Sequence, residues 1–93
     1  MADFISESET SATTTGTASN IRRFIYGVSG TFVGTWELQV LIGGVWHAID
    51  TGTSTKGAVG VDGMIHADYR FEVTAYTSGT LTFNLASSST AAT

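Results

Sequence analysis

The sequence predicts an all-β fold: a small antiparallel β-sandwich, Ig-like or jelly-roll-like, of six to seven short strands with an extended N-terminal arm. Three observations predict it. Apolar and polar residues alternate in several short runs, glycine-containing turns separate those runs, and no stretch shows the i, i+3, i+4, i+7 spacing of an amphipathic helix. A chain of 93 residues corresponds to one domain.

The first twenty residues differ in composition from the rest of the chain. Nine of them are Ser or Thr, and Phe4 and Ile5 are the only large apolar residues after Met1. We expect an extended arm over 1–20, weakly ordered by itself, in which Phe4 and Ile5 bind a partner. A sandwich domain over 21–86 and a flexible tail over 87–93 follow.

A first hairpin is expected after a strand over 21–28, and its turn permits two interpretations. If Ile42-Gly43-Gly44 is a three-residue loop, Trp46 shares a face with Trp36. If Gly43-Gly44 alone forms the turn, Trp46 joins Leu41. In both cases each face of the hairpin is partly apolar, which predicts a subunit interface. Its candidate residues are Leu41, Val45, His47 and Ile49.

A second hairpin is expected around Thr77-Ser78-Gly79, between a strand over 68–76 and a strand over 80–85. Pairing Tyr76 with Thr80 separates apolar from polar side chains completely. The expected core face holds Tyr69, Phe71, Val73, Ala75, Leu81, Phe83 and Leu85. Tyr76 and Arg70 fall on the polar face, and with Trp46 they are the candidate exposed recognition residues. One further short strand, Ala58–Val61, is expected between the hairpins.

Charge and composition exclude several classes of function. The net charge is −4 with four basic residues, so we expect no nucleic-acid binding. No apolar run approaches ~20 residues, so we expect no membrane span. The chain has no cysteine, and His47 and His66 lie nineteen residues apart without a ligand-spaced motif. We therefore expect no catalytic residue, no metal site and no cofactor, and a protein that is not an enzyme.

The low proportion of charged residues points to a protein that works in contact with others. Charged residues make up 13% of the chain, about half of the usual ~25%. A polar surface with few charges allows copies to lie side by side with little repulsion or desolvation. The composition favours oligomerisation, since a domain this small has a thin stability margin.

Four segments resemble small β-sandwich virion proteins of tailed bacteriophages, of the capsid decoration (cement) and head-fibre type. They are residues 31–40 (TFVGTWELQV), 43–46 (GGVW), 68–73 (DYRFEV) and 77–83 (TSGTLTF). Within them, Gly-x-x-x-Leu-Gln-Val, Gly-x-x-Trp, Tyr-Arg-x-x-Val and Ser-Gly are the shared motifs, and the likeness covers roughly residues 30–86.

The resemblance implies a structural role in a virus particle. A decoration protein would be synthesised in the host cytoplasm and sit on the outer capsid surface of the virion. It would bind the major capsid protein and form a homo-oligomer, with a trimer favoured. The alternative is a tail- or fibre-associated recognition module that binds a glycan or a host-cell surface, carried by Tyr76 and Trp46.

Overall fold

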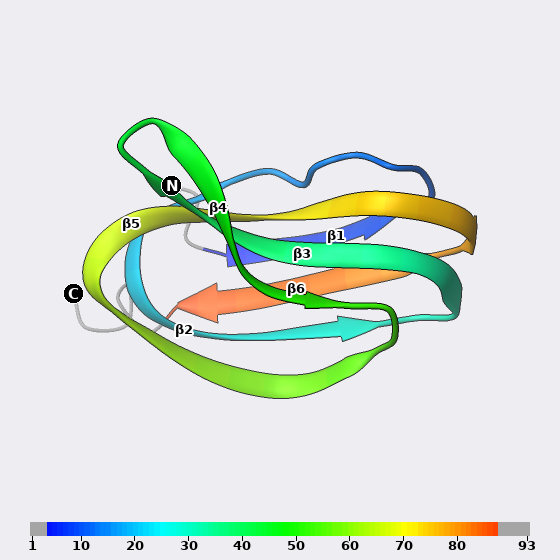
Figure 1. Cartoon of the computed structure of the whole chain (residues 1–93). Coiled ribbons are helices and arrows are strands. Elements are labelled where there is room, and N and C mark those ends of the chain that lie inside the picture. The colour runs from blue at the N-terminus through cyan, green and yellow to red at the C-terminus, as the bar shows by residue number, and fades with distance from the viewer. Residues whose placement is uncertain (1–3, 88–93) are drawn as a thin grey trace.

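Six antiparallel strands account for most of residues 4–87, the part of the chain that the computed structural model describes (Figure 1). In chain order they are β1 (Phe4–Glu9), β2 (Ala18–Ser29), β3 (Phe32–Ile42), β4 (Val45–Gly52), β5 (Lys56–Gly79) and β6 (Leu81–Ser87). Their order in the sheet is β1-β6-β2-β5-β3-β4. The expected all-β antiparallel architecture is confirmed.

Strand β5 belongs to both layers of the sandwich. It is 24 residues long and absorbs the short strand expected over Ala58–Val61. Its first half pairs with β2, and its second half pairs with β3. Because β5 curves around one end of the molecule (Figure 1), the sheet coils back on itself. One layer holds β1, β6, β2 and the first half of β5, and the other holds the second half of β5, β3 and β4.

Aromatic side chains from the two layers meet in the core. Phe71 of β5 stacks on Phe83 of β6, with ring centroids 4.6 Å apart, and Tyr26 of β2 lies 5.8 Å from Phe71. Trp36 and Leu38 of β3 are also fully buried. Interdigitation of the two inner faces is what a sandwich of this size requires for stability.

The expected second hairpin is wrong in its pairing, although most of its burial pattern is right. Strand β6 pairs with β1 and β2, while residues 69–79 of β5 pair with β3. After Gly79 the chain crosses to the other layer, so β5 and β6 face each other instead of lying side by side. A Cβ atom on Gly79, whose φ is +91°, would lie 2.1 Å from the carbonyl oxygen of Thr31, so glycine is needed at this crossing.

A β-bulge explains the two residues of this region whose burial was mispredicted. The pairing of β3 with β5 shifts between Thr35 and Trp36, which leaves Thr74 as an extra residue in β5. The alternation reverses there. Ala75, expected in the core, is exposed, and Tyr76, expected on the polar face, packs against the core.

The first hairpin has the two-residue turn. Gly43 and Gly44 have φ values of +60° and +80°, as a type I′ turn requires, and Ile42 pairs with Val45. Trp46 therefore lies opposite Leu41, on the other face from the buried Trp36. The interpretation that buried both tryptophans is wrong because the turn is one residue shorter than it assumed.

The N-terminal arm is not confirmed as a separate segment. Residues 4–9 pair with β6 along their whole length, and Ile5 is only 3% exposed. Residues 13–15 then cross to the other layer, where Thr15 N donates to Phe71 O at 2.9 Å and Val73 N donates to Thr13 O at 2.8 Å. The pairing of β1 with β6 satisfies backbone N–H and C=O groups of β6 that would otherwise lie on an open edge of the sheet. Residues 1–3 of the expected arm and 88–93 of the expected tail lie outside the described residues.

Replacing Phe83 tests the core contact between the layers. Phe83→Ala removes the ring stacked on Phe71, and we expect a loss of about 3–5 kcal/mol in the free energy of unfolding. Urea denaturation followed by tryptophan fluorescence measures it. Val33→Ala, at an exposed site of β3, should change stability by less than about 0.5 kcal/mol. Equal effects of the two substitutions would contradict the proposed packing.

Two neighbouring residues of β1 test whether this strand is part of the folded domain. Ile5→Ala should cost about 2–4 kcal/mol because Ile5 is buried. Phe4→Ala, next to it but 61% exposed, should cost less than about 0.5 kcal/mol. Thermal unfolding followed by circular dichroism measures both, and an Ile5 variant as stable as the Phe4 variant would mean that β1 is not docked.

Candidate interaction surfaces

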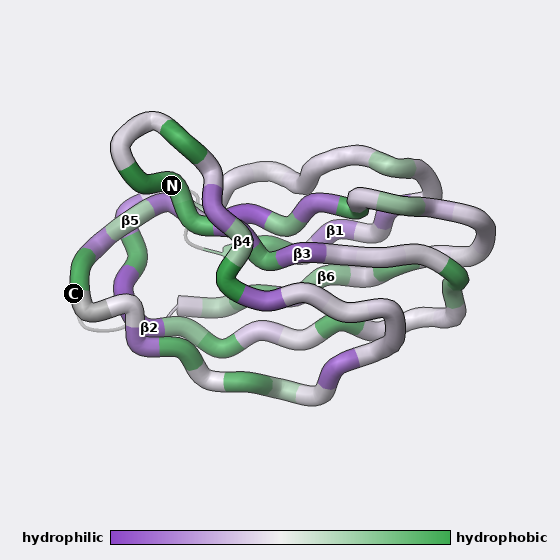
Figure 2. The backbone as a smooth tube through the Cα atoms, viewed as in Figure 1, coloured by the Kyte–Doolittle hydropathy of each residue, from purple (hydrophilic) through white to green (hydrophobic). Residues whose placement is uncertain are grey.

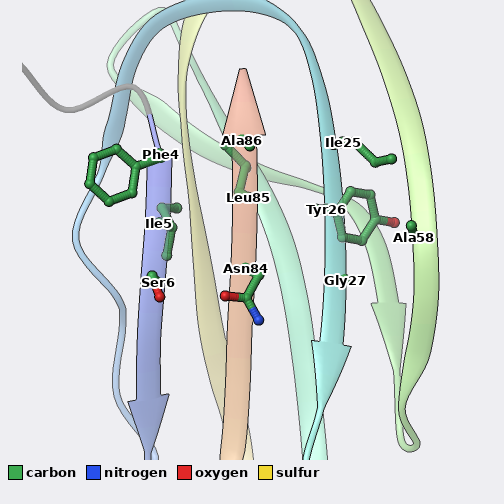
Figure 3. Close-up of a pocket in the computed structure, with 10 residues that line it drawn as sticks. All are labelled: Phe4, Ile5, Ser6, Ile25, Tyr26, Gly27, Ala58, Asn84, Leu85 and Ala86. Atoms are coloured by element: carbon green, nitrogen blue, oxygen red, sulfur yellow. The ribbon is translucent and has the colours of Figure 1, made fainter. Parts of the chain in front are cut away.

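The outer face of the first layer carries a shallow apolar groove of about 500 Å³ (Figure 3). Phe4 of β1 and Ile25 of β2 stand along it, 61% and 48% exposed. Between and beside them lie small side chains of four strands: Ser6, Gly27, Ala58 and Ala86. The register of β6 with its two neighbours places these large residues on either side of one residue, because Phe4 of β1 and Ile25 of β2 both pair with Ala86. No charged side chain lines the groove.

The two expected anchor residues of the arm point in opposite directions. Ile5 belongs to the protein's own core and is 3% exposed. Phe4 is exposed and lies at the β1 side of the groove (Figure 3). Ile25, Ala58 and Ala86 were not predicted from the sequence as surface residues of one site. Alternation in Phe24-Ile25-Tyr26 signals an outward Ile25, but only the strand order shows that it lies near Phe4.

The four residues expected at a subunit interface do not share a face. Val45 and Ile49 are 56% and 46% exposed, and His47 is also exposed. Leu41 instead pairs with Trp46 and is half-buried on the opposite side. Ile49 lines, together with Ile42, an apolar cleft of about 320 Å³ against the first half of β5. Ile42, which belonged to the turn in one of the two interpretations of this hairpin, was not predicted as a surface residue of a site.

Trp46 lies in a polar network on the outer face of the second layer. The guanidinium of Arg70 lies over the Trp46 ring, 4.1 Å from its centroid. Arg70 Nε donates to Oε1 of the buried Gln39 at 2.7 Å. Gln39 Nε2 in turn donates to Glu37 at 3.0 Å and to Glu72 at 2.6 Å. Arg70 thus balances two carboxylates through an amide and covers one face of the indole ring.

The third candidate recognition residue is less exposed than expected. Tyr76 packs against the core after the bulge at Thr74, and its hydroxyl donates to Gly79 O at 2.7 Å. Neither Tyr76 nor Trp46 therefore presents a fully free ring. Of the aromatic recognition surface expected from Tyr76 and Trp46, the part of the Trp46 ring that Arg70 does not cover remains exposed.

A polar contact joins the two layers on their open side. Asp50 of β4 accepts hydrogen bonds from the Tyr26 hydroxyl of β2 and from Thr51 N, and Lys56 Nζ lies 2.9 Å from its Oδ2. Partial burial raises the pKa of Asp50, but the hydrogen bonds from Tyr26, Lys56 and Thr51 outweigh it, so the pKa lies below its usual value. The pKa of Tyr26 is raised, mainly by burial and also by the neighbouring Asp50 carboxylate.

Residues 4–87 hold no group of three or more His, Asp or Glu side chains placed to bind a metal ion. The same part of the chain has no helix that is long and apolar enough to cross a membrane. Neither the protein-family models nor the curated proteins include a match to this sequence.

Asp50→Asn tests the interlayer contact and its pH dependence. The pKa of Asp50 is lower in the folded protein than in the unfolded chain, where it is about 3.9. Its stabilisation is therefore complete above that value and is lost as the pH falls through the folded pKa. We expect Asp50→Asn to lower the free energy of unfolding by about 1–2 kcal/mol at pH 7.

The comparison of the two proteins at low pH gives the control. Urea denaturation at pH 7 and pH 3 should show a smaller loss of stability on acidification in Asp50→Asn than in the unmodified protein. Asp68→Asn, at a residue that accepts a single backbone hydrogen bond from Asn20 N at 3.0 Å, provides a matched substitution. An acid dependence unchanged by Asp50→Asn would contradict the role given to this carboxylate.

Proposed function

We propose that this chain is a structural virion protein that decorates and stabilises a bacteriophage capsid. The observation that carries the proposal is the groove on the outer face of the first layer, which no charged side chain lines and where Phe4 and Ile25 are exposed over a floor of small residues. Exposed apolar patches of this kind are typical of interaction surfaces. The proposed occupant is an apolar surface segment of the major capsid protein, and the proposed location is the outer surface of the virion.

The geometry changes how the contact would be made. The proposed contact uses a face of the sheet and not a free arm, because β1 is paired with β6 and Ile5 is buried. Phe4 remains as the exposed anchor of that segment. A weak apolar contact of this size gains strength on a capsid when it is repeated at every equivalent lattice position, since copies bound to one lattice act together.

The rival proposal is a tail- or fibre-associated module that recognises a glycan or a host-cell surface. Its support is the half-exposed Trp46, which lies on the same face of the sheet as the carboxylates of Glu37 and Glu72, hydrogen-bond acceptors suited to hydroxyl groups. It is the weaker of the two because Arg70 covers one face of the ring. Glycan-array binding that Trp46→Ala abolishes would favour this rival over capsid decoration.

Purified particles of the encoding virus test the proposal directly. Mass spectrometry of those particles should find this chain in an amount comparable to the major capsid protein. A few copies per particle would move the protein to the tail or a vertex and favour the recognition module. Its absence from the particles would overturn both versions of the virion proposal.

Substitution at Phe4 tests the surface. Phe4→Asp places a charge in the groove and should weaken binding to particles lacking this protein by at least about tenfold, the equivalent of roughly 1.4 kcal/mol. Val33→Asp is the matched control, because Val33 is also a strand residue and is similarly exposed (58%). Co-sedimentation of each variant with the particles measures binding, and equal binding by both variants would rule out the groove as the contact.

A further inference from the structure

Strand β4 has a free edge at Val45–Ala48. Within residues 4–87 it pairs with β3 on one side only. The two-residue turn makes Ile42 and Val45 a hydrogen-bonded pair, and pairs of this kind alternate along an antiparallel ladder. The backbone N–H and C=O groups of Trp46 and Ala48 therefore point away from β3. They form a ready site for another strand on the projecting β3–β4 hairpin (Figure 1).

This edge lacks the usual protection against pairing with another strand. Natural proteins guard free edges with charged residues, proline or bulges. Residues 38–49 contain no Asp, Glu, Lys, Arg or Pro, and the register shift that leaves Ile49 unpaired comes only after Ala48. The free edge of β1 differs, because it carries Glu7 and Glu9. Pairing β1 with β1 of a second copy would place like charges opposite one another, whereas pairing β4 with β4 of a second copy would not.

Apolar residues lie on both faces of this segment, so a second strand would cover more than a backbone edge. Val45 and Ile49 are exposed on the face away from the indole ring, and Trp46 is half-exposed on the other. In Figure 2 the hairpin extends from the body of the molecule and has hydrophobic stretches on both sides of its turn. An added strand would shield both faces and satisfy the outward backbone groups at the same time.

We propose that β4 pairs antiparallel with β4 of a second copy, about a two-fold axis at His47. Of the registers that use the outward groups of Trp46 and Ala48, this one matches the side chains best. It sets Trp46 opposite the small Ala48 of the second copy and Val45 opposite its Ile49. Shifting the axis to Trp46 would place two indole rings opposite each other. Shifting it to Ala48 would set Trp46 opposite Asp50, whose carboxylate already binds the Tyr26 hydroxyl and the Lys56 ammonium group.

The pairing joins two sandwiches through one continuous layer, β5-β3-β4 of one copy followed by β4-β3-β5 of the other. A two-fold contact uses the same patch on both copies and closes on itself. A dimer is therefore expected in place of the trimer that the resemblance implied. It leaves the groove around Phe4 free, because that groove lies on the other layer.

Sedimentation equilibrium of the full chain tests the pairing. The unmodified protein should be a dimer. Ala48→Pro removes one outward N–H without removing a bond to β3, and it should yield a monomer with an unchanged circular dichroism spectrum. Ala48→Thr keeps the N–H and should remain a dimer. An unmodified protein that is a monomer or a trimer would overturn the inference, as would an Ala48→Pro variant that dimerises as well as Ala48→Thr.

Charges at position 47 test the two-fold register without proline. His47→Glu and His47→Lys each place like charges opposite one another, so each should weaken dimerisation by roughly tenfold or more. An equimolar mixture of the two should recover dimers, because opposite charges then meet. Failure of the mixture to recover dimers would exclude the axis at His47. Binding to particles is a separate measurement, so a failed capsid proposal would leave this result intact.

Discussion

The stack of Phe71 on Phe83 is the contact on which the two-layer structure depends. These residues lie on strands that are not neighbours in the sheet, so the stack forms only when the sheet coils back on itself. With no cysteine to link the layers, side-chain packing must hold them together. Strand β5 makes this geometry possible, because one continuous backbone supplies a partner for β2 and a partner for β3.

Coiling of the sheet also determines what lies on the surface. The two outer faces become chemically different. The face of β1, β6 and β2 holds an uncharged groove with Phe4 and Ile25 exposed, whereas the other face carries the network of Arg70, Gln39 and two carboxylates. The contact of Asp50 with Tyr26 and Lys56 joins the layers on the side where β4 and the first half of β5 do not pair with each other. The groove and the free edge of β4 are therefore separate surfaces, which allows one molecule to make two different contacts.

The sequence could predict which side chains are buried better than it could predict which strands are neighbours. Strict alternation in Tyr69, Phe71 and Val73 identifies the core face of β5, because a one-residue slip would expose all three. The same alternation is satisfied whether β6 lies beside β5 or across from it, so the pairing was not determined. The bulge at Thr74 has no local signature, and it reverses the positions of Ala75 and Tyr76. For the candidate site, Phe4 was identified from composition, whereas its proximity to Ile25 depends on strand order.

Pairing of the first strand with the last has a consequence for how the chain acquires its structure. Phe4 pairs with Ala86, so β1 has no partner until almost the whole described sequence has been synthesised. Contacts between such distant residues are slow to form, because a long loop must close before they contribute any stability. Ile5 would remain uncovered during this interval, next to the open edge of an incomplete sheet. Completion of the sandwich at β1 and β6 is thus expected to be a late step in folding, and the incompletely folded chain is the form most prone to aggregation.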